Sequence, residues 1–125
     1  ALHGSRVERW ERVASGAAEQ CGRAVVPRVA ATTTLRALLS APLDGTRIAL
    51  LETPGHPPLP AIPHALGDPL LLLVGPAGGF EPGERDQLQA AGFHAAALGP
   101  RILRSETAAV AAVAIAQATW GDLHR

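Results

Sequence analysis

Lysine, methionine and tyrosine are absent from this chain of 125 residues, and cysteine occurs once. The single thiol, Cys21, excludes an internal disulfide and makes a reducing, cytoplasmic compartment the expected location. No apolar run is long enough to cross a bilayer, and no signal peptide is visible. The missing methionine, in a chain that begins at Ala1, favours a fragment of a longer protein.

An excess of charge of either sign is also lacking, because 11 basic and 11 acidic residues balance. A net charge of zero provides no global electrostatic case for binding nucleic acid. All the basic residues are arginines, which suit phosphate contacts, but we attribute the absence of lysine to GC-rich codon usage. The five histidines show no metal-ligand spacing and have no partner cysteines, so no metal site is expected.

The length and the 47% apolar content predict one globular domain with a substantial core. In the N-terminal part, apolar residues recur at three- and four-residue spacings over 5–21 with charged residues between them. This pattern predicts an amphipathic helix that Gly22 ends. A short extended piece over 25–29 follows.

The middle of the chain predicts one short helix and one buried strand. Thr34 is a suitable cap for a helix over 35–39, and the apolar stretch 46–52 reads as a strand. Residues 53–69 hold six of the eleven prolines and are expected to be mostly loop. Within this loop, residues 61–66 have room for one helical turn.

The C-terminal half alternates between strand and helix patterns. Its predicted elements are a strand over 68–74, a helix over 81–91, a strand over 93–98, and a helix over 106–120 capped by Ser105. This order predicts an α/β domain with a largely parallel sheet. The last helix is apolar almost all round, so we expect it to be buried between its own sheet and a partner subunit.

Ligands of such domains bind outside the carboxyl ends of the strands, where the loops gather. Three loops are expected there: ETPG after residue 51, GPAGGF after residue 74 and LGPRILR after residue 97. The glycines of the second loop have no side chains to obstruct a ligand. A purely structural turn is the alternative for this motif, and neither of the common nucleotide-binding glycine fingerprints is present.

Three segments in this order resemble the RsmE family of SPOUT methyltransferases. They are ERW…AAEQCGRAVVP (8–27), LLLVGPAGGFEPGE (71–84) and AGFHAAALGPRILRSETAAVAAVAI (91–115). The resemblance implies a SPOUT-type parallel sheet with helices on both faces, a C-terminal trefoil knot and a homodimer. It also implies transfer of a methyl group from S-adenosylmethionine to N3 of a uridine in bacterial 16S ribosomal RNA, the RNA of the small ribosomal subunit.

The same resemblance implies the site residues. One wall of the cofactor site would be Gly75, Pro76, Gly78 and Gly79. The other wall would be Leu98, Gly99, Ile102 and Leu103, with Thr53 approaching from a third loop. Arg104 and Glu106 would lie nearest the chemistry, and Gln20 and Arg23 are candidate supports or RNA contacts.

Two departures from the family pattern stand out. The glutamate of the family's GPEGG motif is Ala77 here. The family's N-terminal PUA-like RNA-binding domain and the first strand-helix unit of its catalytic domain are not in this sequence, so residues 1–125 are expected to be a catalytic-domain fragment. A non-catalytic dimerisation or RNA-scaffold module is the main alternative, and a nucleotide-binding α/β domain is the other.

The chemistry at uridine N3 requires loss of a proton and stabilisation of the resulting anion. Arg104 suits the stabilising role, since its guanidinium stays charged and donates two parallel hydrogen bonds. The alternative for Arg104 is a phosphate or carboxylate clamp. Glu106 is a candidate base, although a capping role in the first helical turn is the interpretation we favour. His94 lies on a strand and is expected to pack.

Overall fold

The computed structural model describes residues 12, 30–76, 79–99 and 104–121 of the chain. The chain divides into two compact units, Ala1–Ala41 and Pro42–Arg125. Apart from Arg12, which is helical, the predicted helix over 5–21 and the extended piece over 25–29 lie outside the described residues.

Helix α2 (Leu35–Ser40) is the described element of the first unit. The predicted cap is confirmed, because the Thr34 hydroxyl oxygen accepts a hydrogen bond from the backbone N–H of Ala37 at 3.1 Å. This bond satisfies one of the N–H groups that the first turn of a helix leaves without a partner.

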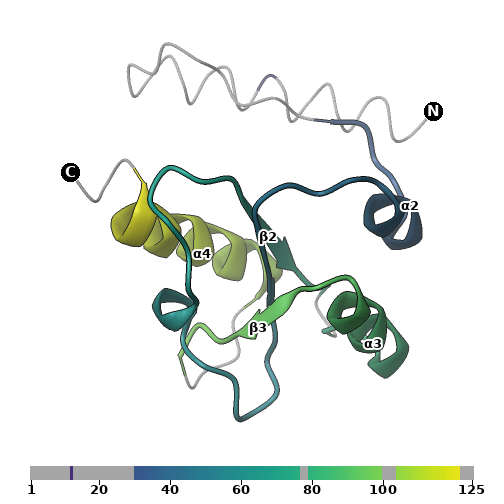
Figure 1. Ribbon diagram of the computed structural model, residues 1–125. Coiled ribbons are helices and arrows are strands. Elements are labelled where there is room, and N and C mark those ends of the chain that lie inside the picture. Colours follow the sequence, from purple (N-terminus) through teal and green to yellow (C-terminus); the bar gives the residue numbers. More distant parts are fainter. Residues whose placement is uncertain (1–11, 13–29, 77–78, 100–103, 122–125) are drawn as a thin grey trace. The chain divides into compact units, whose positions relative to one another are not determined.

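A parallel sheet of three strands forms the centre of the second unit (Figure 1). The strands are β1 (Thr46–Leu50), β2 (Leu70–Val74) and β3 (His94–Ala96), in the order β2-β1-β3. All three strands begin and end inside the predicted ranges or at their limits. The predicted α/β class with a parallel sheet is confirmed.

Alternation along β1 divides the two faces of the sheet. Ile48 and Leu50 are buried in one core cluster with Ala112 of helix α4 (Ser105–Trp120). Ala49 faces the other way, toward Leu88 of helix α3 (Pro82–Ala90), with which it lines a common hollow. The two helices therefore cover opposite faces of the sheet (Figure 1).

The helical turn in the proline-rich segment is displaced from its predicted place. A single 3-10 turn, η1 (Leu59–Ala61), begins two residues before the predicted range 61–66 and overlaps it only at Ala61. The prediction was wrong because Pro63 disfavours the helical conformation of the residue before it, and Ile62 is extended (φ −72°, ψ 128°). The turn buries Leu59 and Ile62 against the core cluster of β1 and α4.

The cap of α4 also differs from the prediction by one residue. The helix begins at Ser105, so Arg104 rather than Ser105 is its N-cap, and the Arg104 side chain makes no capping bond. The backbone changes from extended to helical after Arg104 (φ −63°, ψ 153°), whose carbonyl accepts from the N–H of Ala108 at 2.7 Å. Helix α3 starts one residue later than predicted, with Glu81 as its N-cap.

Helix α4 has one buried side and one exposed side in the described part of the chain. Ala112 and Ala116 are buried, whereas Val110 is 71% exposed and Val113 is 54% exposed. No helix among the described residues is both long and apolar enough to cross a membrane.

Two glycines near the start of the sheet provide a matched test of packing. Gly45 (φ +76°) and Gly67 (φ +85°) both have a backbone conformation that favours glycine, but a Cβ on Gly45 would collide with the carbonyl of Pro69, and a Cβ on Gly67 meets nothing within 4 Å. We expect Gly67→Ala to lower the free energy of unfolding by about 1–2 kcal/mol through backbone strain. Gly45→Ala should cost about 1–3 kcal/mol more through overpacking. Urea unfolding of both variants measures the difference, and equal losses would contradict the predicted collision.

Candidate functional site

The loop after β1 is fastened to the end of β3 at both of its ends. The backbone N–H of Leu51 donates to the carbonyl of Ala96 at 2.9 Å as the chain leaves the strand. The chain then returns, and Ala97 donates to the Pro57 carbonyl at 2.8 Å and accepts from the Leu59 N–H at 3.0 Å. Residues 52–56 therefore form a short excursion with fixed ends at the carboxyl edge of the sheet.

A side-chain hydrogen bond joins two residues within this loop. The Thr53 hydroxyl and Nε2 of His56 lie 2.7 Å apart and share a hydrogen bond. Gly55 between them has a φ of +94°, which allows the sharp turn that brings the two side chains together.

The loop after β2 contains the glycine motif. The N–H of Gly79 donates to the carbonyl of Pro76 at 2.7 Å, and Gly79 has a φ of +78°. The aromatic ring of Phe80 lies beneath Gly75, so a Cβ on Gly75 would stand 3.1 Å from the ring. A side chain at Gly75 would therefore require the Phe80 ring to shift, whereas at Gly79 the Glu52 carboxylate is the only group of the described residues within 4 Å of an added Cβ.

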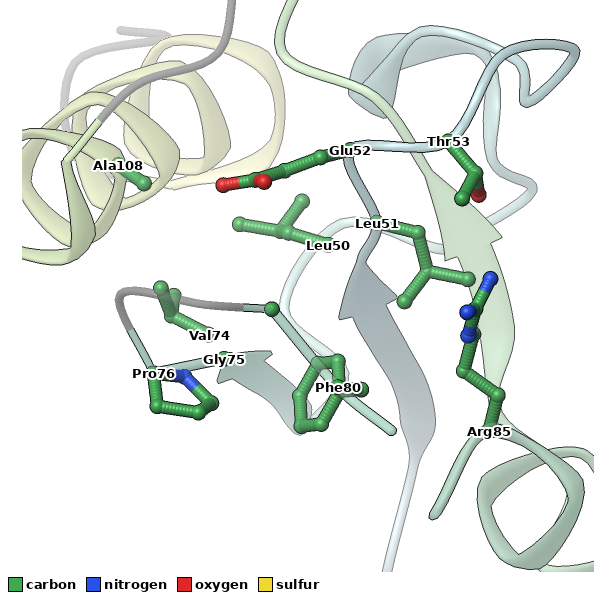
Figure 2. A pocket seen from close by; sticks show the side chains of 11 residues that line it. Leu50, Leu51, Glu52, Thr53, Val74, Gly75, Pro76, Phe80, Arg85 and Ala108 are labelled. Atoms are coloured by element: carbon green, nitrogen blue, oxygen red, sulfur yellow. The ribbon is translucent and has the colours of Figure 1, made fainter. Parts of the chain in front are cut away.

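Two hollows lie between these loops. The glycine-loop hollow, about 130 Å³, lies between the loops after β1 and β2, and Figure 2 shows the residues that line it. The outer hollow, about 440 Å³, separates the loop after β1 from the loop after β3. Its volume falls within the range of small-molecule sites, roughly 300–1,000 Å³. Both hollows share Leu51, Glu52 and Thr53, so the loop after β1 forms a common wall.

A third hollow, the α3-side hollow, lies between helix α3 and the face of the sheet that α3 covers. It measures about 380 Å³ and has an apolar floor that includes Ala49, Leu88 and Phe93. Arg85 and Thr53 line both this hollow and the glycine-loop hollow. The three loops thus gather at one edge of the sheet, as the parallel order predicted.

All of the predicted cofactor residues that the structure describes line one or both of the first two hollows. Thr53, Gly75, Pro76 and Gly79 line the glycine-loop hollow, and Leu98 and Gly99 line the outer hollow together with Thr53. Gly78, Ile102 and Leu103 lie outside the described residues, as do Gln20, Arg23 and Ala77.

Arg104 and Glu106 lie at the start of α4, apart from the residues that line the three hollows. Both are exposed. Glu106 lies in the first turn of α4, where the helix dipole favours a carboxylate. His94 is exposed at the start of β3 rather than packed, which corrects its prediction, because an edge strand leaves this side chain uncovered.

The structure adds two charged residues that sequence reasoning missed, Glu52 and Arg85. Glu52 lies two residues after the end of β1, and Figure 2 shows its carboxylate reaching toward Ala108 of α4. Arg85 stands three residues before the buried Leu88, which places both on the side of α3 that faces the sheet. The three-residue spacing from Leu88 was the feature of the sequence that could have predicted the position of Arg85.

The Arg85 guanidinium is partly enclosed. Its Nε atom is buried and has no hydrogen-bond partner among the described residues. In Figure 2 its side chain runs toward Leu51 and Thr53, on the opposite side of the β1 exit from Glu52. No group of three or more His, Cys, Asp or Glu side chains in the described part of the chain is arranged to hold a metal ion.

Comparisons with known proteins agree on one family. The model of the RNA methyltransferase domain matches residues 3–117. The chain is 35% identical over 108 residues to the ribosomal RNA small subunit methyltransferase E of Bacillus subtilis, covering 81% of this chain and 42% of the relative. It is 34% identical over 118 residues to the protein of that name from Mycobacterium bovis, covering 88% and 45%.

Solved structures show the same similarity. A ribosomal RNA small subunit methyltransferase E from Neisseria gonorrhoeae, bound to S-adenosyl methionine, superposes with a TM-score of 0.87 at 37% identity. It covers 98% of this chain and 51% of its own. A putative methyltransferase from Legionella pneumophila, also with bound cofactor, gives a TM-score of 0.86 at 31% identity, covering 97% and 49%. The chain spans about half the length of the relatives that it matches.

Proposed function

We propose, since this chain belongs to the RNA methyltransferase domain family, that it transfers a methyl group from S-adenosylmethionine to N3 of a uridine in 16S ribosomal RNA. The observation that carries the proposal is the meeting of three loops, two of them with open glycine backbone, at the carboxyl edge of the parallel sheet. The similarity to a relative solved with S-adenosyl methionine supports this cofactor.

The described residues fit the cofactor. Among the described residues, an added Cβ would meet nothing within 4 Å at Gly99 and only the Glu52 carboxylate at Gly79, which leaves room for a ligand to approach the backbone at both positions. Thr53 stands in the wall common to both hollows. We expect Gly78, Ile102 and Leu103 to complete the two walls. When bound, S-adenosylmethionine supplies an electrophilic methyl group on a sulfonium.

Arg104 has the properties that an anion stabiliser needs. It is exposed, so its guanidinium is free to reach a substrate, and it stands at the N-terminus of α4, where the helix dipole favours negative charge. In this proposal Arg104 donates hydrogen bonds to the uracil oxygen that gains charge as N3 loses its proton. For Glu106 we favour support of the helix start, and the role of base is its alternative.

The proposal extends to the assembly. We infer a C-terminal trefoil knot, a homodimer and a cytoplasmic location from the family resemblance. We also infer that residues 1–125 form the catalytic domain of an enzyme that has a PUA-like RNA-binding domain. Exposure of Val110 and Val113 on an apolar helix supports the dimer, because such side chains gain free energy when they leave water.

A methylation assay tests the function as a whole. The full-length protein should transfer labelled methyl groups from S-adenosylmethionine to small-subunit ribosomal RNA, and the label should map to uridine N3. Cofactor binding without any transfer would favour the RNA-scaffold alternative. Binding of ATP in place of S-adenosylmethionine would favour the nucleotide-binding alternative.

A substitution at Gly79 tests whether the glycine loop binds the cofactor. Gly79→Ala should weaken binding of S-adenosylhomocysteine, because its Cβ enters the space in front of the loop. Gly67→Ala is the matched control, since Gly67 has a similar φ (+85° against +78°) and lies outside the three hollows. Both variants should lose about 1–2 kcal/mol of stability. Calorimetric titration measures affinity, and equal affinities in the two folded variants would remove Gly79 from the site.

Val110 tests the dimer. Val110→Glu places a charge on the exposed apolar side of α4 and should dissociate the homodimer, because a buried unpaired charge is strongly unfavourable. Gln87→Glu adds the same charge at an exposed position of α3 and should leave the dimer intact. Sedimentation velocity of both full-length variants distinguishes them. A dimer that survives the first substitution would place the interface elsewhere.

Arg104 tests the chemistry. Arg104→Lys keeps the charge and loses the forked donors, so turnover should fall by about 10²-fold while cofactor affinity stays unchanged. Arg36→Lys, on α2, makes the same exchange at another exposed arginine and should methylate normally. The measurement is single-turnover methylation of ribosomal RNA. A normal rate in the Arg104 variant, or loss of cofactor binding, would contradict the stabilising role.

A further inference from the structure

The carboxylate of Glu52 occupies a position set by the strand that precedes it. Leu50 faces α4 and belongs to the core cluster. Because side chains alternate along an extended chain, Glu52 lies on the same side two residues later. Figure 2 shows its carboxylate extended toward Ala108 of α4.

Glu52 also faces the glycine loop across the hollow. Its Oε2 atom lies 3.9 Å from the position that a Cβ on Gly79 would occupy. With hydrogen in place of a side chain, Gly79 leaves the space beside this oxygen open. A ligand that contacts the backbone of Gly79 therefore comes close to a carboxylate.

The charge of Glu52 is not compensated by the described residues. No hydrogen bond or ion pair joins Glu52 to any of them. Arg85 lines the same hollow, but its side chain runs toward Thr53 on the α3 side of the β1 exit. Among the described residues that line the glycine-loop hollow, Glu52 is therefore the only charged group on the α4 side, and its negative charge favours a cationic ligand.

We propose that Glu52 distinguishes the charged methyl donor from its neutral product. This inference rests on the proposed function. Transfer of the methyl group to uridine N3 breaks the S–CH3 bond and leaves the electron pair on sulfur, so the sulfonium of S-adenosylmethionine becomes the uncharged thioether of S-adenosylhomocysteine. The proton of N3 leaves with the base. A carboxylate beside the sulfur attracts the donor and not the product, and so promotes product release.

The experiment compares two ligands and two variants of the full-length protein by calorimetry. Glu52→Gln keeps the shape of the side chain and removes its charge. We expect it to weaken binding of S-adenosylmethionine by about tenfold, as for a unit charge a few ångströms away in a partly solvated site. Binding of S-adenosylhomocysteine should stay unchanged. Asp44→Asn, an exposed carboxylate before β1, is the control and should leave both affinities unchanged.

Sinefungin, which carries an amine at the place of the sulfonium methyl, is a stable cationic probe and should follow S-adenosylmethionine. Equal weakening of all three ligands by Glu52→Gln, or no weakening of any, would overturn the proposal. If the unaltered protein binds none of these ligands, the proposed function itself fails. Glu52 is exposed, so circular dichroism should show both variants folded as the parent is.

Discussion

The parallel pairing of β1 with both of its neighbours is the interaction on which the rest of this structure depends. β1 pairs with β2 from Thr46 to Leu50 and with β3 from Ile48 to Leu50, so one strand aligns the carboxyl ends of all three. Each loop of the candidate site starts at one of those ends. The backbone bonds of Leu51 and Ala97 then fix the loop after β1 against β3.

The residues that follow β1 also place the polar groups of the site on two different sides of the sheet. Because side chains alternate along an extended chain, Glu52 points toward α4 and Thr53 points toward α3. Arg85 of α3 lies on the same side as Thr53. Two opposite charges thereby line one hollow without meeting, because the end of the strand stands between them. Such separation leaves each charge available to a ligand, whereas an ion pair would satisfy both internally.

The two helices differ in what they contribute. Helix α3 has a polar outer surface and fastens itself to the sheet through Arg47, whose Nη1 donates to the Ala91 carbonyl at 2.6 Å, near the negative end of the helix dipole. Helix α4 buries small residues, Ala112 and Ala116, which allow close packing on β2 and η1. Its larger side chains, Val110 and Val113, remain exposed.

The local sequence pattern was sufficient to predict most of the described helices and strands and their order along the chain. The apolar runs before each glycine-rich turn identified β1, β2 and β3, and Thr34 identified the cap of α2, because strand burial and capping depend on neighbours within a few residues. The positions of Gly75, Leu98 and Gly99 along hollows at this edge agree with what the parallel sheet and the family resemblance led us to expect. The start of the proline-rich turn and the cap of α4 were not predicted correctly. The turn begins at Leu59, two residues before the predicted range, and α4 begins at Ser105, one residue early.

Tertiary structure alone decided which side chains share a hollow. Glu52 and Arg85 are separated by a strand, a loop and the start of a helix in the sequence, and nothing in their local pattern brings them together. Their meeting depends on the register of β1 and β2 and on the direction in which α3 crosses the sheet. The sequence by itself determined that the strands run parallel and that their loops gather at one edge of the sheet, because these features follow from periodicity and turn chemistry. The charges at that edge were decided by long-range packing, which no local pattern encodes.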